Sequence, residues 1–212
     1  MRKLLVVLWL SHSAVALAQI PELENPGTIH AVQEREYRLN HELAFGVGVL
    51  PLDAFYKGLL AQLSYTAHFS DHLAWQVARG AYSYNVDTGL RKQLIRDFSV
   101  NPTAFEEVQY MVGSDIIWSP FYGKTAFLNK SVSHFEVFLI AGGSILNLAN
   151  STGGPGLFRP AVNFGLGARL FSSKHLSYRL DLADNLVVSK DKGIFNVPTI
   201  QLSAAINFGV TE

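Results

Sequence analysis

Six ionisable residues stand at the polar positions of segments in which apolar and polar residues otherwise alternate. Acids and bases on one interior face can neutralise each other, line a path for ions, or supply a carboxylate pair for acid–base catalysis. We favour mutual pairing into a structural plug, because an isolated buried charge is expensive. A gated ion path is the alternative, and catalysis is disfavoured because a substrate would have to enter a filled interior. The six residues are Glu42, Asp115, Glu136, Arg169, Arg179 and Asp181.

A strict two-residue alternation surrounds these charges. In residues 162–170 every even position is apolar and every odd position is Asn, Gly or Arg, and residues 200–210 alternate in a similar way. Side chains of a β-strand point to opposite faces with period two, so each segment is predicted to be a strand with one apolar face. The signal recurs in eight segments, at residues 43–49, 59–69, 73–77, 108–118, 135–141, 162–170, 178–182 and 200–210.

Composition indicates which face of these strands meets the surroundings. Only 16% of the residues are charged, against about 25% in ordinary soluble domains. The polar positions carry small uncharged residues such as Gly46, Ser64 and Gly165, which suit the crowded lumen of a narrow barrel. We therefore predict an all-β fold, an eight-stranded antiparallel up-and-down transmembrane β-barrel whose apolar face meets lipid. A soluble ligand-binding barrel of the lipocalin type is the alternative class.

The N-terminus has the pattern of a secretory signal. Residues 1–3 are basic at two positions, residues 4–10 are apolar, and Ala16-Leu17-Ala18 fits a cleavage site. Cysteine is absent, so disulfides and thiolate metal sites are excluded. This organisation predicts export to the outer membrane of a Gram-negative bacterium. The expected parts are a signal peptide at residues 1–18, a periplasmic N-terminal arm at 19–38 and the outer-membrane barrel at 39–212.

Connections between the strands should alternate between short periplasmic turns and longer outer loops. Residues 69–72 and 171–175 are short enough for turns, whereas residues 119–133 are long where a short turn is expected. Arg79 falls on the apolar face of the third strand, where a cation is costly. Either a bulge near Gly80 turns it inward, or it lies near the outer rim and extends to water. The expected outer loops are residues 85–107, 144–160 and 184–198, with residues 50–57 of intermediate length.

A basic amphipathic segment lies in the first long outer loop. Its apolar residues recur at i, i+4, i+5 and i+8, which predicts a helix between Thr88 and Phe98 with a basic opposite face. Such a helix could bind lipopolysaccharide phosphates or an outer partner. It could equally be a lid packed on the barrel mouth with a solvated basic face. The segment contains Leu90, Arg91, Lys92, Leu94, Ile95, Arg96 and Phe98.

Histidines are expected in the arm and at the periplasmic ends of the strands. A rim of imidazoles could bind metal or respond to pH. We favour a role as amphipathic residues at the membrane–water boundary, because no pair has the spacing of helical metal ligands. The sequence therefore predicts no metal site and no cofactor. The six histidines that follow the signal peptide are His30, His41, His68, His72, His134 and His175.

A resemblance to a known family covers nearly all of the chain after residue 18. It rests on residues 31–58 (AVQEREYRLNHELAFGVGVLPLDAFYKG), 120–124 (PFYGK) and 134–137 (HFEV). These stretches resemble the outer-membrane β-barrel domain family typical of myxobacteria and Bdellovibrio-like predatory bacteria. The resemblance implies an eight-stranded outer-membrane barrel and leaves its chemistry open.

Together these features predict a structural or partner- and lipid-interaction role in the bacterial cell envelope, not an enzyme. The expected partners are outer-membrane lipid and lipopolysaccharide, the barrel assembly machinery during biogenesis, and an envelope protein. We expect a monomer with no nucleic-acid partner. A small ion-conducting pore is the alternative function. An outer-membrane lipid-modifying enzyme is disfavoured, because the expected outer loops contain no histidine that could act as a base.

Overall fold

The computed structural model describes residues 35, 37–51, 56–87, 97, 106–127, 131–150, 156–189 and 193–209. The predicted signal peptide and most of the predicted arm lie outside the described residues. Among the residues that are described, none forms a helix long and apolar enough to cross a membrane.

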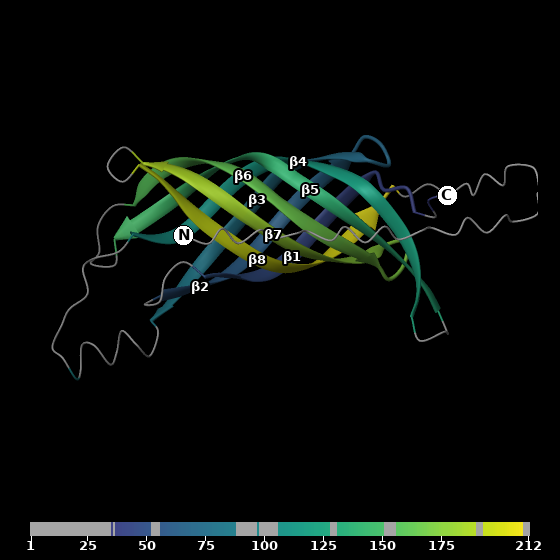
Figure 1. Ribbon diagram of the computed structural model, residues 1–212, viewed down its shortest axis with the longest axis horizontal. Helices are drawn as coiled ribbons and strands as arrows, with labels where there is room; N and C mark the ends of the chain where they lie inside the picture. Colours follow the sequence, from purple (N-terminus) through teal and green to yellow (C-terminus); the bar gives the residue numbers. More distant parts are fainter. Residues whose placement is uncertain are drawn as a thin grey trace, which may run out of the picture. The chain divides into compact units, whose positions relative to one another are not determined.

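Eight antiparallel strands close into a barrel (Figure 1). Each strand pairs with its neighbours in the sequence, and β1 pairs with β8 to complete the closure. Closure pairs backbone groups between strands all the way around the wall, as a structure surrounded by hydrocarbon requires. The predicted fold class is confirmed. The strands are β1 (His41–Leu50), β2 (Tyr56–His68), β3 (Leu73–Asp87), β4 (Glu106–Phe127), β5 (Ser131–Asn150), β6 (Leu157–Phe171), β7 (Leu176–Ser189) and β8 (Gly193–Phe208).

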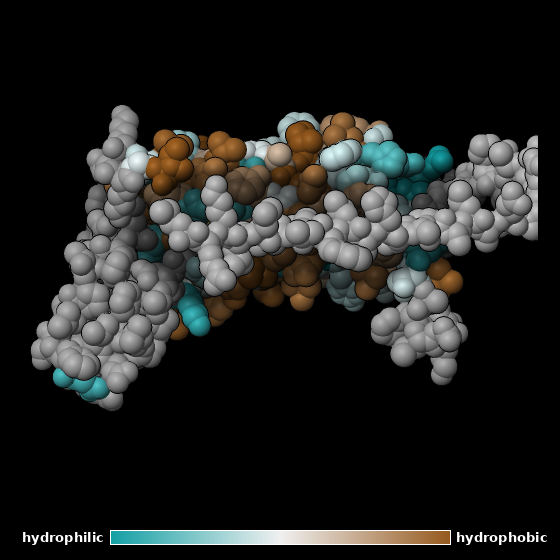
Figure 2. All heavy atoms as spheres, in the orientation of Figure 1, coloured by the Kyte–Doolittle hydropathy of each residue, from teal (hydrophilic) through white to brown (hydrophobic). Residues whose placement is uncertain are grey.

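The barrel has an apolar outside. In β1, Phe45 and Val47 are 62% and 58% exposed, whereas Glu42 and Ala44 on the other face are buried. The same alternation continues around the barrel, and Figure 2 shows the outward residues as a brown band on the described strands. A soluble barrel buries its apolar face. In this barrel the apolar face is outside and the polar face is inside, as the sequence predicts.

The interior changes character along the barrel axis. Toward the end away from residues 35–40, inward apolar side chains pack into one buried cluster, against which Phe195 also lies. Buried polar residues such as Ser83 and Asn185 stand beside it. At the positions of this cluster both faces of the strand are apolar, so the alternation of polar and apolar residues is interrupted there. We call this cluster the apolar plug; it consists of Leu50, Leu60, Ala81, Val108, Met111, Leu146, Leu148, Ala161, Val187 and Val197.

Two of the expected outer loops are much shorter than predicted. The strands extend into residues 144–160 and 184–198, so that only residues 151–156 and 190–192 connect them. The seventh strand, predicted from the alternation at residues 178–182, has 14 residues. The even apolar positions of residues 108–118 predict Val108 on the lipid face, but it belongs to the apolar plug. Inward apolar residues such as Leu146 and Val187 explain part of these errors, because they remove the alternation by which a half-polar strand is recognised. Val108 has a separate cause, a shift in the register of β4 with β5 between Val108 and Tyr110.

Residues 119–127 belong to β4 and residues 131–133 to β5, at the end of a long hairpin, which corrects the prediction of a long connection over 119–133. β4 has 22 residues and β5 has 20, and the hairpin extends past the neighbouring strands (Figure 1). A register shift between Trp118 and Phe121 moves the apolar face from even to odd positions, which hides the continuity of the strand. Pro120 is tolerated because β3 pairs with β4 only as far as Trp118.

Arg79 faces the interior because β3 carries a bulge. The register of β3 with β2 shifts between Tyr65 and Thr66, and its register with β4 shifts between Gln76 and Arg79. The irregularity changes which face the following residues occupy. Arg79 is consequently only 5% exposed. Of the two explanations offered by the sequence, the inward bulge is confirmed.

We expect the outward face to reject charge in proportion to depth. Leu166→Arg places a cation on an outward position within β6, where Leu166 is 48% exposed, and should cost about 2–4 kcal/mol. Ile194→Arg places the same charge on the same face at the start of β8, where the cost should be about 0–1 kcal/mol. Denaturant unfolding in lipid vesicles measures both. Equal losses would contradict a lipid-facing band.

Candidate functional site

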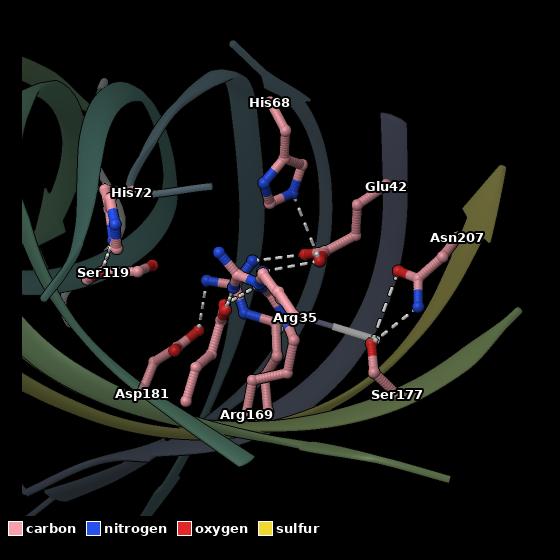
Figure 3. Close-up of polar contacts among 11 residues, drawn as sticks. Arg35, Glu42, His68, His72, Ser119, Arg169, Ser177, Asp181 and Asn207 are labelled. Carbon is pink, nitrogen blue, oxygen red and sulfur yellow. Dashed lines mark hydrogen bonds and ion pairs between the residues drawn. The ribbon is translucent and has the colours of Figure 1, made fainter. Parts of the chain in front are cut away.

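Alternating acidic and basic side chains close the interior at the end of the barrel near Arg35 (Figure 3). The Arg179 guanidinium donates from Nη1 to Glu42 Oε1 at 2.5 Å and from Nη2 to Asp181 Oδ2 at 3.1 Å. The other Glu42 oxygen, Oε2, lies 2.6 Å from Arg169 Nη2. Glu42 therefore lies between two arginines and pairs with both.

The chain of charges continues to the residues that precede β1. Arg169 Nη1 donates to Glu136, and the guanidinium of Arg35 pairs with the second oxygen of the same carboxylate. Three acids and three arginines thus alternate from Asp181 to Arg35. We call them the charged cluster; its members are Asp181, Arg179, Glu42, Arg169, Glu136 and Arg35.

Strand register explains why these side chains meet. Glu136 of β5 is directly opposite Arg169 of β6, and Arg169 is directly opposite Arg179 of β7. Like charges that face each other across strands destabilise a sheet. Glu42 of β1 contacts both arginines. It thereby turns a repulsive pair into a bridged one.

An aromatic ring and a glycine shape this end of the interior. Phe138 is buried, and its ring centroid lies 5.5 Å from Cζ of Arg169 and 5.0 Å from Cζ of Arg179. Both guanidinium groups therefore gain a cation–π contact as well as ion pairs. A Cβ atom at Gly167 would lie 2.4 Å from the Phe138 ring. Only glycine leaves space for the ring at this position.

Arg35 is the member of the charged cluster that the sequence analysis missed. It belongs to the predicted arm, where no alternation marks it, so only the tertiary contact with Glu136 shows its role. Burial, together with the nearby Arg169, lowers the pKa of the Arg35 guanidinium. Its Cζ lies 5.0 Å from the ring centroid of Tyr122 on the long hairpin. The end of the arm thus joins the closure of the barrel mouth.

Asp115 is not part of the charged cluster, although the sequence grouped it there. It pairs with Arg79, whose Nε lies 2.9 Å from its Oδ2. Asn163 donates to the other carboxylate oxygen at 2.8 Å and accepts from Ser144 at 2.7 Å. This second network depends on the β3 bulge, which sequence alternation does not reveal. The six predicted residues therefore divide into a group of five and a separate acid.

The described histidines gather at the end of the barrel that carries the charged cluster. His68 Nε2 lies 3.8 Å from Glu42 Oε2, and Nδ1 of His72 lies 2.9 Å from the carbonyl oxygen of Ser119 (Figure 3). Within the described ranges, no group of three or more His, Asp or Glu residues could hold a metal ion. The described set is His41, His68, His72, His134 and His175, while His30 lies outside the described residues.

The predicted amphipathic segment, Leu90 to Phe98, lies almost wholly outside the described residues. Of residues 88–98 the structure describes Asp97, which is exposed. The two interpretations of this segment therefore both stay predictions.

The arrangement of charges suits sealing rather than acid–base chemistry. Each carboxylate of the charged cluster contacts at least one guanidinium, so its negative charge is stabilised in place. Beyond the cluster, the apolar plug lies in the opposite half of the interior, beside buried polar side chains such as Asn185. An interior of eight strands is just wide enough for side chains. Its two halves are thus filled by different means.

An apolar outside, a polar and charged interior and eight closed strands define a small membrane β-barrel. The chain is similar in fold to the N-terminal β-barrel domain of Pseudomonas aeruginosa OprF, with a TM-score of 0.53 and 11% identity over 81% of this chain and 100% of that one.

Two further solved structures show weaker similarity. Neisserial surface protein A matches with a TM-score of 0.40 and 15% identity over 81% of this chain and 95% of that one. Ail of Yersinia pestis matches with a TM-score of 0.39 and 11% identity over 81% of this chain and 100% of that one. No family model and no curated protein sequence matches the chain. The family resemblance noted in the sequence therefore stays a prediction.

We expect direct coupling between Glu136 and Arg169. Glu136→Gln leaves Arg169 and Arg35 short of a counter-ion and should destabilise the barrel by about 3–5 kcal/mol. The double variant Glu136→Gln/Arg169→Gln should lose much less than the sum of the two single losses. Equilibrium unfolding in detergent measures all three, with Lys124→Gln, an exposed charge on the same hairpin, as a control near zero. Additive losses would mean that the two side chains do not interact.

Proposed function

We propose that this protein is a non-conducting outer-membrane β-barrel that acts through its surface, in a structural or partner- and lipid-interaction role in the bacterial cell envelope. The observation that carries the proposal is the double closure of the interior. The charged cluster occupies one half and the apolar plug the other. With the interior filled, the outward face and the two ends are the surfaces left for function.

Three features support the outer membrane as the site of action. The outward band is apolar, the sequence begins with the pattern of an export signal, and the fold is that of the OprF barrel domain. Lipid and lipopolysaccharide are then the immediate surroundings, and the barrel assembly machinery is the partner during biogenesis. The chain is proposed to be a monomer in its assembled state.

A non-enzymatic role is favoured by the state of the buried acids. Glu42 and Glu136 each contact two arginines, and Asp181 contacts one. A general acid or base needs access to a substrate proton. Carboxylates engaged inside a filled barrel lack that access.

The wild-type barrel should pass no unitary current in a planar bilayer. Arg169→Gln should also remain silent, because it opens the charged cluster and leaves the apolar plug intact. A variant that combines Arg169→Gln with Met111→Ser and Leu146→Ser should conduct, since both halves are then weakened. Unitary currents of the wild type, with an ion selectivity that changes in Glu136→Gln, would instead establish the alternative function of a small pore.

The orientation can be tested with trypsin added to intact cells. The end of the barrel where β1 begins and β8 ends should face the periplasm. Residues 88–105 should then be at the cell surface and residues 128–130 in the periplasm. We expect cleavage at Arg91, Lys92 or Arg96, and cleavage at Lys130 only after the outer membrane is opened. Peptide mass spectrometry identifies the cut. Early cleavage at Lys130 would invert the proposed topology.

A further inference from the structure

One acidic residue, Asp184, lies on the apolar outward face of the barrel. The outward positions of β7 include Tyr178, Leu182 and Val188, which are all exposed, and Asp184 falls between the last two. Its neighbours across the strands are Phe164 of β6 and Pro198 of β8. The carboxylate is thus in the interior of the apolar band and not at either rim.

Asp184 belongs to the lining of an open groove on this face. The groove has a volume of about 670 Å³, within the range of about 300–1,000 Å³ that is usual for ligand pockets. Its lining is otherwise almost wholly apolar. The large side chains along it are Leu139, Phe164, Leu166, Leu182 and Ile200.

The carboxylate of Asp184 differs from the acids of the interior in having no counter-ion. Glu42, Glu136, Asp181 and Asp115 all pair with arginine. Among the described residues, Asp184 has no such partner, and its Oδ1 is buried without a hydrogen bond. An ionisable group at this depth is expensive and is usually paired.

We propose that this groove binds a membrane-embedded segment of another protein that brings a lysine or arginine to Asp184. Charge complementarity identifies the occupant, because the groove supplies apolar contact and one unpaired negative charge. The hydrocarbon of a lipid offers no hydrogen-bond donor at this depth. This inference rests on the proposed interaction role and names the chemistry of the partner.

A second copy of this chain fits the groove less well. The exposed lysines on the described strands lie near the ends of the barrel. Lys57 is the second residue of β2, and Lys124 is on the long hairpin. A symmetric pair built on this groove would bring Asp184 toward Asp184, and like charges repel. A partner with a basic side chain within its membrane segment removes this conflict.

Model peptides test the proposal directly. The full barrel contains no cysteine, so Ser172→Cys in the β6–β7 turn allows a single fluorescent label. The probes are two leucine-rich transmembrane peptides, one with a central lysine and one with leucine in its place. Energy transfer in zwitterionic phospholipid vesicles should show the lysine peptide binding about threefold to tenfold more tightly. Asp184→Asn and Asp184→Leu should abolish this difference.

A relocated carboxylate provides the matched control. Asp184→Leu/Leu63→Asp moves the acid to an outward position on β2, away from the groove, and should show no lysine preference. If this variant does not assemble, the comparison of wild type with Asp184→Asn decides. Asp184→Leu alone should not lower the unfolding midpoint of the isolated barrel.

Three results would overturn the proposal. The first is equal binding of the two peptides to the wild type. The second is a destabilised Asp184→Leu barrel, which would indicate a structural role for the acid. The third is Asp184-dependent energy transfer between labelled copies of the barrel, which would indicate self-association. Bilayer currents test the non-conducting function separately, so either proposal can fail while the other stands.

Discussion

The burial of charge inside a narrow barrel is the constraint on which the rest of this structure depends. Eight strands leave an interior that side chains fill, so each buried guanidinium or carboxylate needs a counter-ion within reach. The charged cluster meets this need by alternation, with Glu42 between Arg169 and Arg179 and with Glu136 between Arg169 and Arg35. Without Arg35, three acids would face two arginines. The end of the predicted arm is therefore part of the electrostatic balance of the barrel.

Different kinds of side chain occupy the two halves of the interior. Near the chain ends, ion pairs and the Phe138 ring occupy the space. In the other half, the apolar plug does so with aliphatic side chains such as Leu50 and Met111. An ion crossing the barrel would have to break paired charges and then pass the apolar plug. Closure at both levels supports the proposal that the protein acts through its outer surface.

The contrast between interior and exterior acids supports this view of the surface. Inside, Asp115 has Arg79 and Asn163 as partners, and the β3 bulge is what delivers Arg79 to it. Outside, Asp184 lies in an apolar groove without a partner among the described residues. This contrast supports the proposed binding surface around Asp184.

The sequence by itself determined the strand count, the closed all-β fold and the face that meets lipid, because alternation is a local signal that each strand carries alone. It also identified five members of the charged cluster, since their inward positions follow from the same alternation. Only the tertiary structure decided the rest. Strand lengths near the apolar plug, the inward turn of Arg79 and the contribution of Arg35 depend on which side chains meet across strands. Such contacts join residues far apart in the chain, and no local periodicity records them.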